Sequence, residues 1–156
     1  MISNNHDDLL SEMGASLSLN LTFDENGMCD LVFDEDTLIT IRSSEDDGNI
    51  ILSTALFEEL PEPMSFNLVQ TLLSMSLSPC MNNGGNSPVV GIDEDSGLVV
   101  LYQVCTASLL NKEKLLNIFT EFVQAKLVLT DSLSEDNSAD TEISDSNTLN
   151  NNDMFA

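Results

Sequence analysis

Residues 17–56 read LSLNLTFDENGMCDLVFDEDTLITIRSSEDDGNIILSTAL, and this segment carries the clearest structural pattern in the chain. Short runs rich in Leu, Ile, Val, Phe and Thr alternate with three acidic turns, DENG, DED and SEDDG. Asn26-Gly27 suits the positive φ angles of a two-residue hairpin loop, and Asp47-Gly48-Asn49 suits a second reversal. Strand-forming residues between such turns predict an antiparallel meander. The predicted strands are 18–24, 28–34, 37–43 and 49–56.

A first helix is predicted before the meander, over residues 4–17. Gly14 in this helix would let another backbone approach closely. His6, the single histidine, falls in the polar first turn, where we expect the helix end to fray. Apolar residues recur at spacings of three and four, which places on one face Leu9, Leu10, Met13 and Leu17.

A second helix is predicted at about 64–77, after the helix-breaking segment Leu60-Pro61-Glu62-Pro63. Apolar residues occupy most of its circumference. Few helices in so small a chain are buried on every side, so the excess apolar surface predicts contact with another subunit; burial within one chain is the alternative. The predicted dimer contacts are Phe66, Val69, Leu72, Leu73 and Met75.

Two further strands, 88–93 and 97–105, and a third helix at about 111–130 complete the pattern. Apolar residues share one face of this helix, while its basic residues, including Lys126, are expected to lie away from that face. The predicted fold class is α+β, with an antiparallel sheet of five to six strands and three helices in the order α-β-β-β-β-α-β-β-α.

Acidic residues dominate the charge: 27 Asp and Glu against 4 Lys and Arg give a net charge of −23 over 156 residues. Such a chain repels phosphate backbones and anionic membrane surfaces, which argues against nucleic-acid and membrane binding. It favours a basic or weakly charged partner, or serves solubility alone. Acidic, Ser- and Asn-rich sequence from Asp131 onward predicts a folded domain over 1–130 and a disordered tail over 131–156.

Patterns for export, membrane insertion and catalysis are not found in the sequence. The N-terminus resembles no signal peptide, and three widely spaced cysteines suit buried thiols in a cytoplasmic protein. A lone histidine near a chain end supports no catalytic triad, and Gly84-Gly85 lacks the rest of a phosphate loop. The acidic turns do not match a calcium loop. From these observations together we expect no enzyme activity, no bound metal and no cofactor.

The ordered elements suggest a family. The chain resembles the class I, or Tir-chaperone-like, chaperones of bacterial type III secretion systems, over about residues 4–130. The most specific match runs from Phe23-Asp24-Glu25-Asn26-Gly27-Met28-Cys29 into Phe33-Asp34-Glu35. Weaker matches are Asn83-Gly84-Gly85 and Lys112-Glu113-Lys114-Leu115.

The resemblance implies a cytoplasmic bacterial homodimer with a twisted antiparallel sheet, or a heterodimer with a related chaperone. Its dimer contact would map onto helix 64–77. Such a chaperone binds the N-terminal segment of a secreted effector, keeps it soluble and partly unfolded, and uses no nucleotide. The implied partner-binding residues are Leu9, Leu10, Met13, Leu17, Leu21, Phe33, Ile39 and Ile41.

Three other functions remain open at this stage. A regulator of the same fold would bind a secreted control protein or anti-activator and couple secretion to transcription. An acidic mimic of nucleic acid would need charges on one regular face, whereas these charges gather in turns. An enzyme is the third alternative.

Overall fold

The computed structural model describes residues 6–57, 63–81 and 87–142. These ranges contain three α-helices, five strands and a short 3-10 turn. The elements are α1 (His6–Ser16), β1 (Met28–Phe33), β2 (Thr37–Ser44), β3 (Asn49–Ala55), α2 (Phe66–Met81), β4 (Val89–Ile92), β5 (Val99–Thr106), η1 (Ala107–Leu109) and α3 (Lys112–Glu142). The predicted α+β class is confirmed, with five strands.

The strands form one antiparallel sheet in the order β1-β2-β3-β5-β4. The meander prediction holds for β1, β2 and β3, each of which pairs with the next along the chain. β5 then pairs with β3, and β4 pairs with the other side of β5. β1 and β4 are therefore the two outer strands of the sheet.

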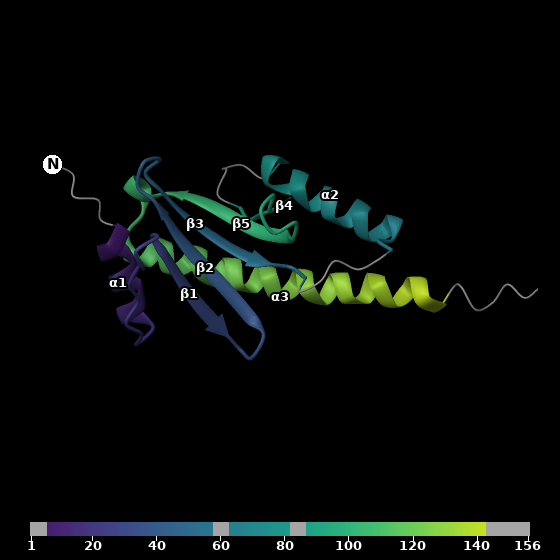
Figure 1. The fold of residues 1–156 in the computed structure, drawn as a ribbon, viewed down its shortest axis with the longest axis horizontal. Coiled ribbons are helices and arrows are strands. Elements are labelled where there is room, and N and C mark those ends of the chain that lie inside the picture. The colour runs from purple at the N-terminus through teal and green to yellow at the C-terminus, as the bar shows by residue number, and fades with distance from the viewer. Residues whose placement is uncertain (1–5, 58–62, 82–86, 143–156) are drawn as a thin grey trace, which may run out of the picture.

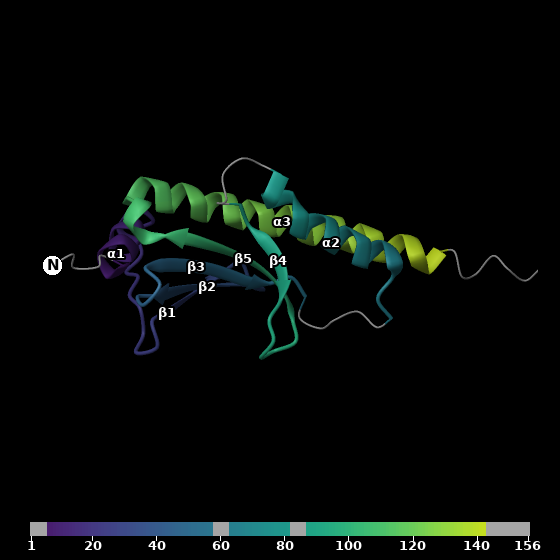
Figure 2. The same cartoon turned by 90° about the horizontal axis from the view of Figure 1, so that it is seen from above.

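Helices cover one face of this sheet. α1 and α3 lie on the same side of it, and α3 extends beyond the ends of the strands (Figures 1 and 2). α2 lies toward the β4 end of the sheet and contacts β4 and α3. None of the described helices covers the opposite face, which we call the open face. Its outward residues include Met28, Asp30, Val32, Leu38, Thr40, Arg42, Ser53, Tyr102 and Val104.

The core lies between the sheet and α1 and α3, and its residues come from alternate strand positions. In β5 every second residue from Val99 to Cys105 is buried, as the two-residue period of a strand requires. Phe119 of α3 packs against Phe33 of β1, with ring centroids 5.5 Å apart. Most of the remaining core is aliphatic, as the scarcity of aromatic residues implies.

Residues 18–24, predicted as the first strand, form no strand. The chain instead folds back onto α1 directly after the helix ends. Leu19 N–H donates to the carbonyl oxygen of Gly14 over 2.8 Å, and Ser18 takes a φ of 60°. A Cβ on Gly14 would lie 2.8 Å from both Leu19 O and Leu21 Cγ. The glycine therefore permits the close approach that holds this segment on the helix.

The turn at Asn26-Gly27 is present, but it leads into β1 and does not join two strands. The Asp24 carboxylate accepts from the backbone N–H of Asn26 and of Met28, both over 2.8 Å. Gly27 supplies the positive φ, at 71°. The positive φ predicted for Gly27 is thus confirmed, whereas Asn26 does not adopt one, and the strand predicted before the turn is absent.

His6 begins α1 and is buried, so the expectation of a frayed end is wrong. Its Nδ1 lies 2.6 Å from Ser43 Oγ on β2. This contact ties the first turn of the helix to the sheet across 37 residues of sequence.

α3 is longer than predicted, and it continues through the start of the predicted tail to Glu142. Leu133 is buried, so the apolar stripe continues past residue 130. Lys126, predicted to lie away from that stripe, belongs to it, because it follows Phe119 by seven residues and Phe122 by four. Residues 143–156 of the predicted tail lie outside the described residues.

Replacing Gly14 with Ala tests the reversal after α1. Alanine favours a helix, but its Cβ would meet a backbone oxygen, which cannot move aside without moving the chain. We expect the free energy of unfolding to fall by about 1–3 kcal/mol, measured by urea denaturation. Ser11→Ala, on the exposed side of the same helix, should change it by less than about 0.5 kcal/mol. Equal stability of Gly14→Ala and wild type would contradict the assigned contact.

Candidate partner-binding surfaces

Most of the implied partner-binding residues lie in the core. Leu17 is exposed and Phe33 is half-buried, whereas the other six side chains are buried in the core, four on α1 and the segment that follows it and two on β2. A partner could touch those six only by displacing α1 or that segment. Their role in binding stays a prediction. The buried six are Leu9, Leu10, Met13, Leu21, Ile39 and Ile41.

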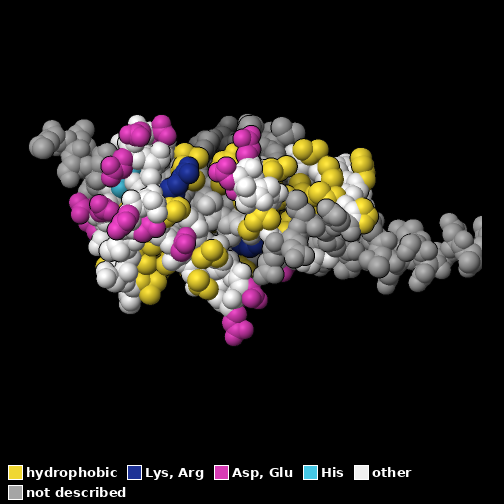
Figure 3. Space-filling model, in the orientation of Figure 1, with side chains coloured by type: hydrophobic (Ala, Val, Ile, Leu, Met, Phe, Trp, Pro, Cys, Tyr) yellow, Lys and Arg dark blue, Asp and Glu magenta, His cyan; other side chains and the backbone are white. Residues whose placement is uncertain are grey.

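The open face of the sheet is the first surface that a partner can reach directly. Its polar positions are partly engaged with each other, since Thr40 Oγ1 donates to the Asp30 carboxylate across the β1–β2 pair over 2.6 Å. Figure 3 views this face and shows hydrophobic side chains across it, with acidic ones gathered toward the α1 end. Its exposed large apolar side chains are Met28, Val32, Leu38, Tyr102 and Val104.

The outer edge of β1 adjoins this face. Ser43 N–H donates to Gly27 O over 2.8 Å, which marks one bonded pair at the start of the β1–β2 ladder. Bonded and non-bonded pairs alternate along an antiparallel ladder, so the backbone groups of Asp30 and Val32 point away from β2. The Val32 side chain is 71% exposed. An extended segment could therefore pair with this edge and lay side chains on the open face.

α2 carries a second exposed apolar surface. The helix starts where Ser65 Oγ accepts from Leu68 N–H over 3.0 Å, an N-cap contact. Leu68 and Leu72 point into the core, whereas Phe66 and Leu73 are 80% and 63% exposed.

Three of the predicted dimer contacts make one exposed stripe at spacings of three and four, Phe66, Val69 and Leu73, which we call the α2 stripe. Leu72, predicted with them, faces its own chain, and the side chain of Met75 lies outside the described residues. The apolar residues of α2 thus form two separate surfaces. One is buried by its own chain, and the other is left exposed.

A family model matches most of the chain. The model describes the Tir chaperone protein (CesT) family, and it matches residues 8–126. The chain belongs to this family. The match includes α1, the whole sheet, α2 and the first half of α3, and it confirms the resemblance predicted from the sequence.

Solved structures agree with membership of the Tir chaperone family. A chain of the HopA1-SchA chaperone-effector complex is 26% identical, with a TM-score of 0.71 over 84% of this chain and 98% of that one. A chain of the ExsC-ExsE complex is 22% identical, with a TM-score of 0.68 over 85% and 96%. The structure of the Yersinia pestis type III secretion chaperone SycH with a fragment of YscM2 contains a chain 14% identical, with a TM-score of 0.61 over 79% and 98%. The last two show the fold alone. No curated protein sequence matches the chain.

Titratable side chains in this member of the Tir chaperone family form no metal-binding group of three or more within the ranges that the structure describes. Burial raises the pKa of the Cys105 thiol to about 11, and burial also raises the pKa of Cys29. Both thiols are therefore protonated at neutral pH and poor nucleophiles. Over the same ranges, none of the helices is long and apolar enough to cross a membrane.

Proposed function

We propose that this chain is a type III secretion chaperone that binds the N-terminal chaperone-binding segment of a secreted effector. The client would be kept soluble, partly unfolded and competent for secretion. One observation carries the proposal: a member of the Tir chaperone family leaves one face of its sheet free of the described helices, and apolar side chains occupy that face.

The edge of β1 is where we place the first contact with the client. Backbone groups of Asp30 and Val32 point outward there, and main-chain pairing tolerates many client sequences. Alternate client side chains would then lie over Val32 and Leu38 on the open face. Ordering a disordered segment costs a few kcal/mol, so a contact area larger than one strand is required. The exposed apolar residues on β2 and β5 extend the client-binding surface from β1 across the open face, which supplies this additional contact area.

Charge adds a preference for the kind of client segment. The net charge is −23, and acidic residues gather at the α1 end of the open face (Figure 3). A negative surface accelerates the encounter with a basic segment, and the effect weakens as salt rises. We therefore infer that client segments with basic residues beside the pairing strand associate fastest.

The proposed activity involves binding without a covalent change in the client. It therefore assigns the chain no catalytic residue and no cofactor. Because chaperones of this kind act before export, we place the protein in the bacterial cytoplasm.

The α2 stripe is proposed as a dimer contact with a second copy of the chain or with a related chaperone. Phe66 and Leu73 are large, apolar and largely exposed, which is costly for an isolated chain. All sixteen residues of α2 lack charge, in a protein whose net charge is −23. Two such helices can therefore meet without bringing like charges together.

Two charges in the α2 stripe test the dimer contact. Phe66→Asp with Leu73→Asp should convert the dimer to a monomer, because unpaired carboxylates would be buried at the contact. We expect a loss of about 3 kcal/mol or more, roughly a hundredfold in the dimer dissociation constant. Light scattering across a dilution series measures it. Asn67→Asp, on another side of the helix, should leave the dimer intact, and a persistent dimer in the double variant would place the contact elsewhere.

A proline at Val32 tests the client-binding edge. Val32→Pro removes an outward N–H without breaking the pairing with β2, and should weaken client binding roughly tenfold through the loss of one hydrogen bond. Val32→Thr keeps the N–H and serves as the matched control. The client is first identified by mass spectrometry of proteins that co-purify from native cells, and its affinity is then measured by calorimetry.

Three outcomes of that experiment lead to different conclusions about the function and the binding site. An effector segment that binds wild type and Val32→Thr more tightly than Val32→Pro supports the proposal. A small control protein in place of an effector would favour the regulatory alternative. Equal affinity of the client for wild type, Val32→Thr and Val32→Pro would show that the client does not pair with the edge of β1.

A further inference from the structure

The sheet splits at one end, between β2 and β3. Their ladder runs from the Ser44–Asn49 pair to the Thr40–Ser53 pair and stops there. Beyond that point β2 continues to pair with β1 as far as Thr37, and β3 continues to pair with β5 as far as Ala55. The two inner strands therefore part over the first residues of β2 and the last residues of β3.

Side chains take over the hydrogen bonding across the split. Thr54 Oγ1 donates to Leu38 O over 2.7 Å, which links β3 to β2. Lys126 Nζ donates to Ala55 O over 2.5 Å, which links α3 to the end of β3. One of the three ammonium N–H groups is occupied by this carbonyl.

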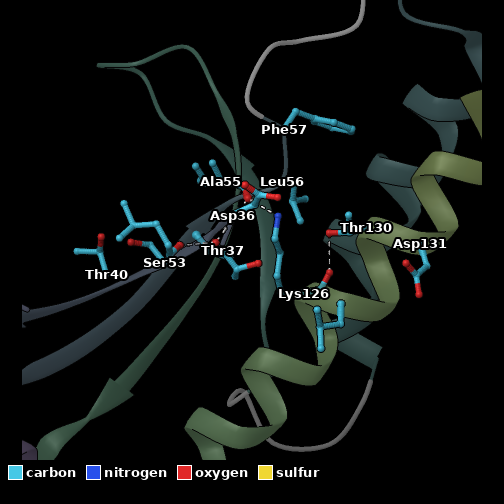
Figure 4. A pocket seen from close by; sticks show the side chains of 14 residues that line it. Asp36, Thr37, Thr40, Ser53, Ala55, Leu56, Phe57, Lys126, Thr130 and Asp131 are labelled. Atoms are coloured by element: carbon cyan, nitrogen blue, oxygen red, sulfur yellow. Dashed lines mark hydrogen bonds between the residues drawn. The ribbon is translucent and has the colours of Figure 1, made fainter. Parts of the chain in front are cut away.

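A pocket of about 510 Å³ opens at the split. Lys126 extends from α3 toward the end of β3 at this place, and Asp131 points away from the ammonium group (Figure 4). Hydroxyl groups and apolar side chains make up most of the wall. Among the lining residues are Thr37, Thr40, Ser53, Leu56, Phe57 and Leu127.

Lys126 is an uncommon group to find in such a wall. Its side chain is only 8% exposed, and burial lowers its pKa. Fully buried lysines are rare unless they are paired with an acid. Among the described residues, the contact with the Ala55 carbonyl is the one hydrogen bond of the Lys126 ammonium, and this ammonium makes no ion pair. The ammonium can therefore donate further hydrogen bonds to a group in the pocket.

We propose that this pocket is a subsite for an aspartate or glutamate side chain of the bound client, held by the Lys126 ammonium. The proposal rests on the chaperone function proposed above. A carboxylate is the group that best matches a buried cation with free donors, because charge-assisted hydrogen bonds are stronger than neutral ones. The client's aliphatic carbons would contact Phe57 and Leu127.

The two acidic residues of the pocket do not prevent a client carboxylate from binding to the Lys126 ammonium. Asp36 and Asp131 both line it, and both are exposed to water. Water and salt screen their charges, whereas the buried ammonium is screened much less. The pocket also lies close to the open face, since Leu38, Thr40 and Ser53 belong to both. A client on the open face can therefore reach it with one side chain.

Lysine NMR tests the subsite without any client. The four basic residues are Arg42, Lys112, Lys114 and Lys126, so the spectrum of the lysine ε-carbons holds three signals. Butyrate serves as the probe, and butyramide is its neutral counterpart of nearly equal shape. We expect butyrate to shift the Lys126 signal saturably and to bind about tenfold or more tightly than butyramide. The exposed Lys112 and Lys114 are internal controls and should stay unchanged.

Three results would overturn the subsite: no shift of Lys126, parallel shifts of all three lysines, or equal binding of the amide. In each case Lys126 serves only to hold the Ala55 carbonyl. Lys126→Met should abolish the butyrate shifts at the Thr37 and Thr130 amides, whereas Lys126→Arg should retain them. Thermal unfolding of each variant separates loss of binding from loss of fold.

Client binding completes the test and separates the two proposals. The co-purified client should bind Lys126→Met roughly tenfold more weakly than wild type, and changing its matching acidic residue to Gln should cause no further loss. Capture of a client with equal affinity for Lys126→Met and wild type would reject the subsite and keep the chaperone function. If butyrate binds at Lys126 but no client protein co-purifies with the chain, the chaperone function is rejected and the carboxylate site is retained.

Discussion

Burial of one sheet face beneath α1 and α3 is the interaction on which the rest of the structure depends. Alternate residues of every strand enter that core, and the aliphatic side chains gain their stability from removal of apolar area from water. The same alternation sends the other half of each strand to the open face. Since none of the described helices covers that face, the chain gains a stable core on one side and an accessible apolar surface on the other. The alternation of side chains along each strand thus underlies both the stable core and the surface proposed to bind the client.

Charge explains how such a surface stays in solution. A chain with exposed apolar residues on an open face and on α2 would be expected to associate without specificity. A net charge of −23 makes unselected contact between copies unfavourable, because like charges repel. The uncharged α2 is the exception to the acidic coat, and the cation of Lys126 is an exception within the pocket. The proposed dimer contact and the proposed subsite both lie where negative charge is missing.

The sequence predicted the three helices, the five observed strands and the family, because strand alternation and turn residues are local signals, but it also predicted a strand at residues 18–24 that the structure does not contain. Its errors came from tertiary contacts. Residues 18–24 alternate like a strand, but the close approach at Gly14 holds them on α1. Charge suggested that Lys126 faces water, although its spacing from Phe122 places it in the buried stripe. Most of the implied partner-binding residues lie in the core, and their role in binding stays a prediction. Val32 and Leu73 are exposed because none of the described elements covers them. The apolar circumference of the second helix predicted the exposure of Leu73, whereas no local pattern predicted that of Val32.

Hydrogen exchange of the backbone amides is the most direct test of the claim that other polypeptides cover the surface left by folding. The measurement compares the chain alone, at a dilution that favours the monomer, with the chain bound to its co-purified client. We predict slow exchange in both states for amides bonded within the β3–β5 ladder. We predict strong protection on binding for the outward amides of Asp30 and Val32. Unchanged exchange at those two amides, in a complex that demonstrably forms, would show that the client does not cover this edge of the sheet.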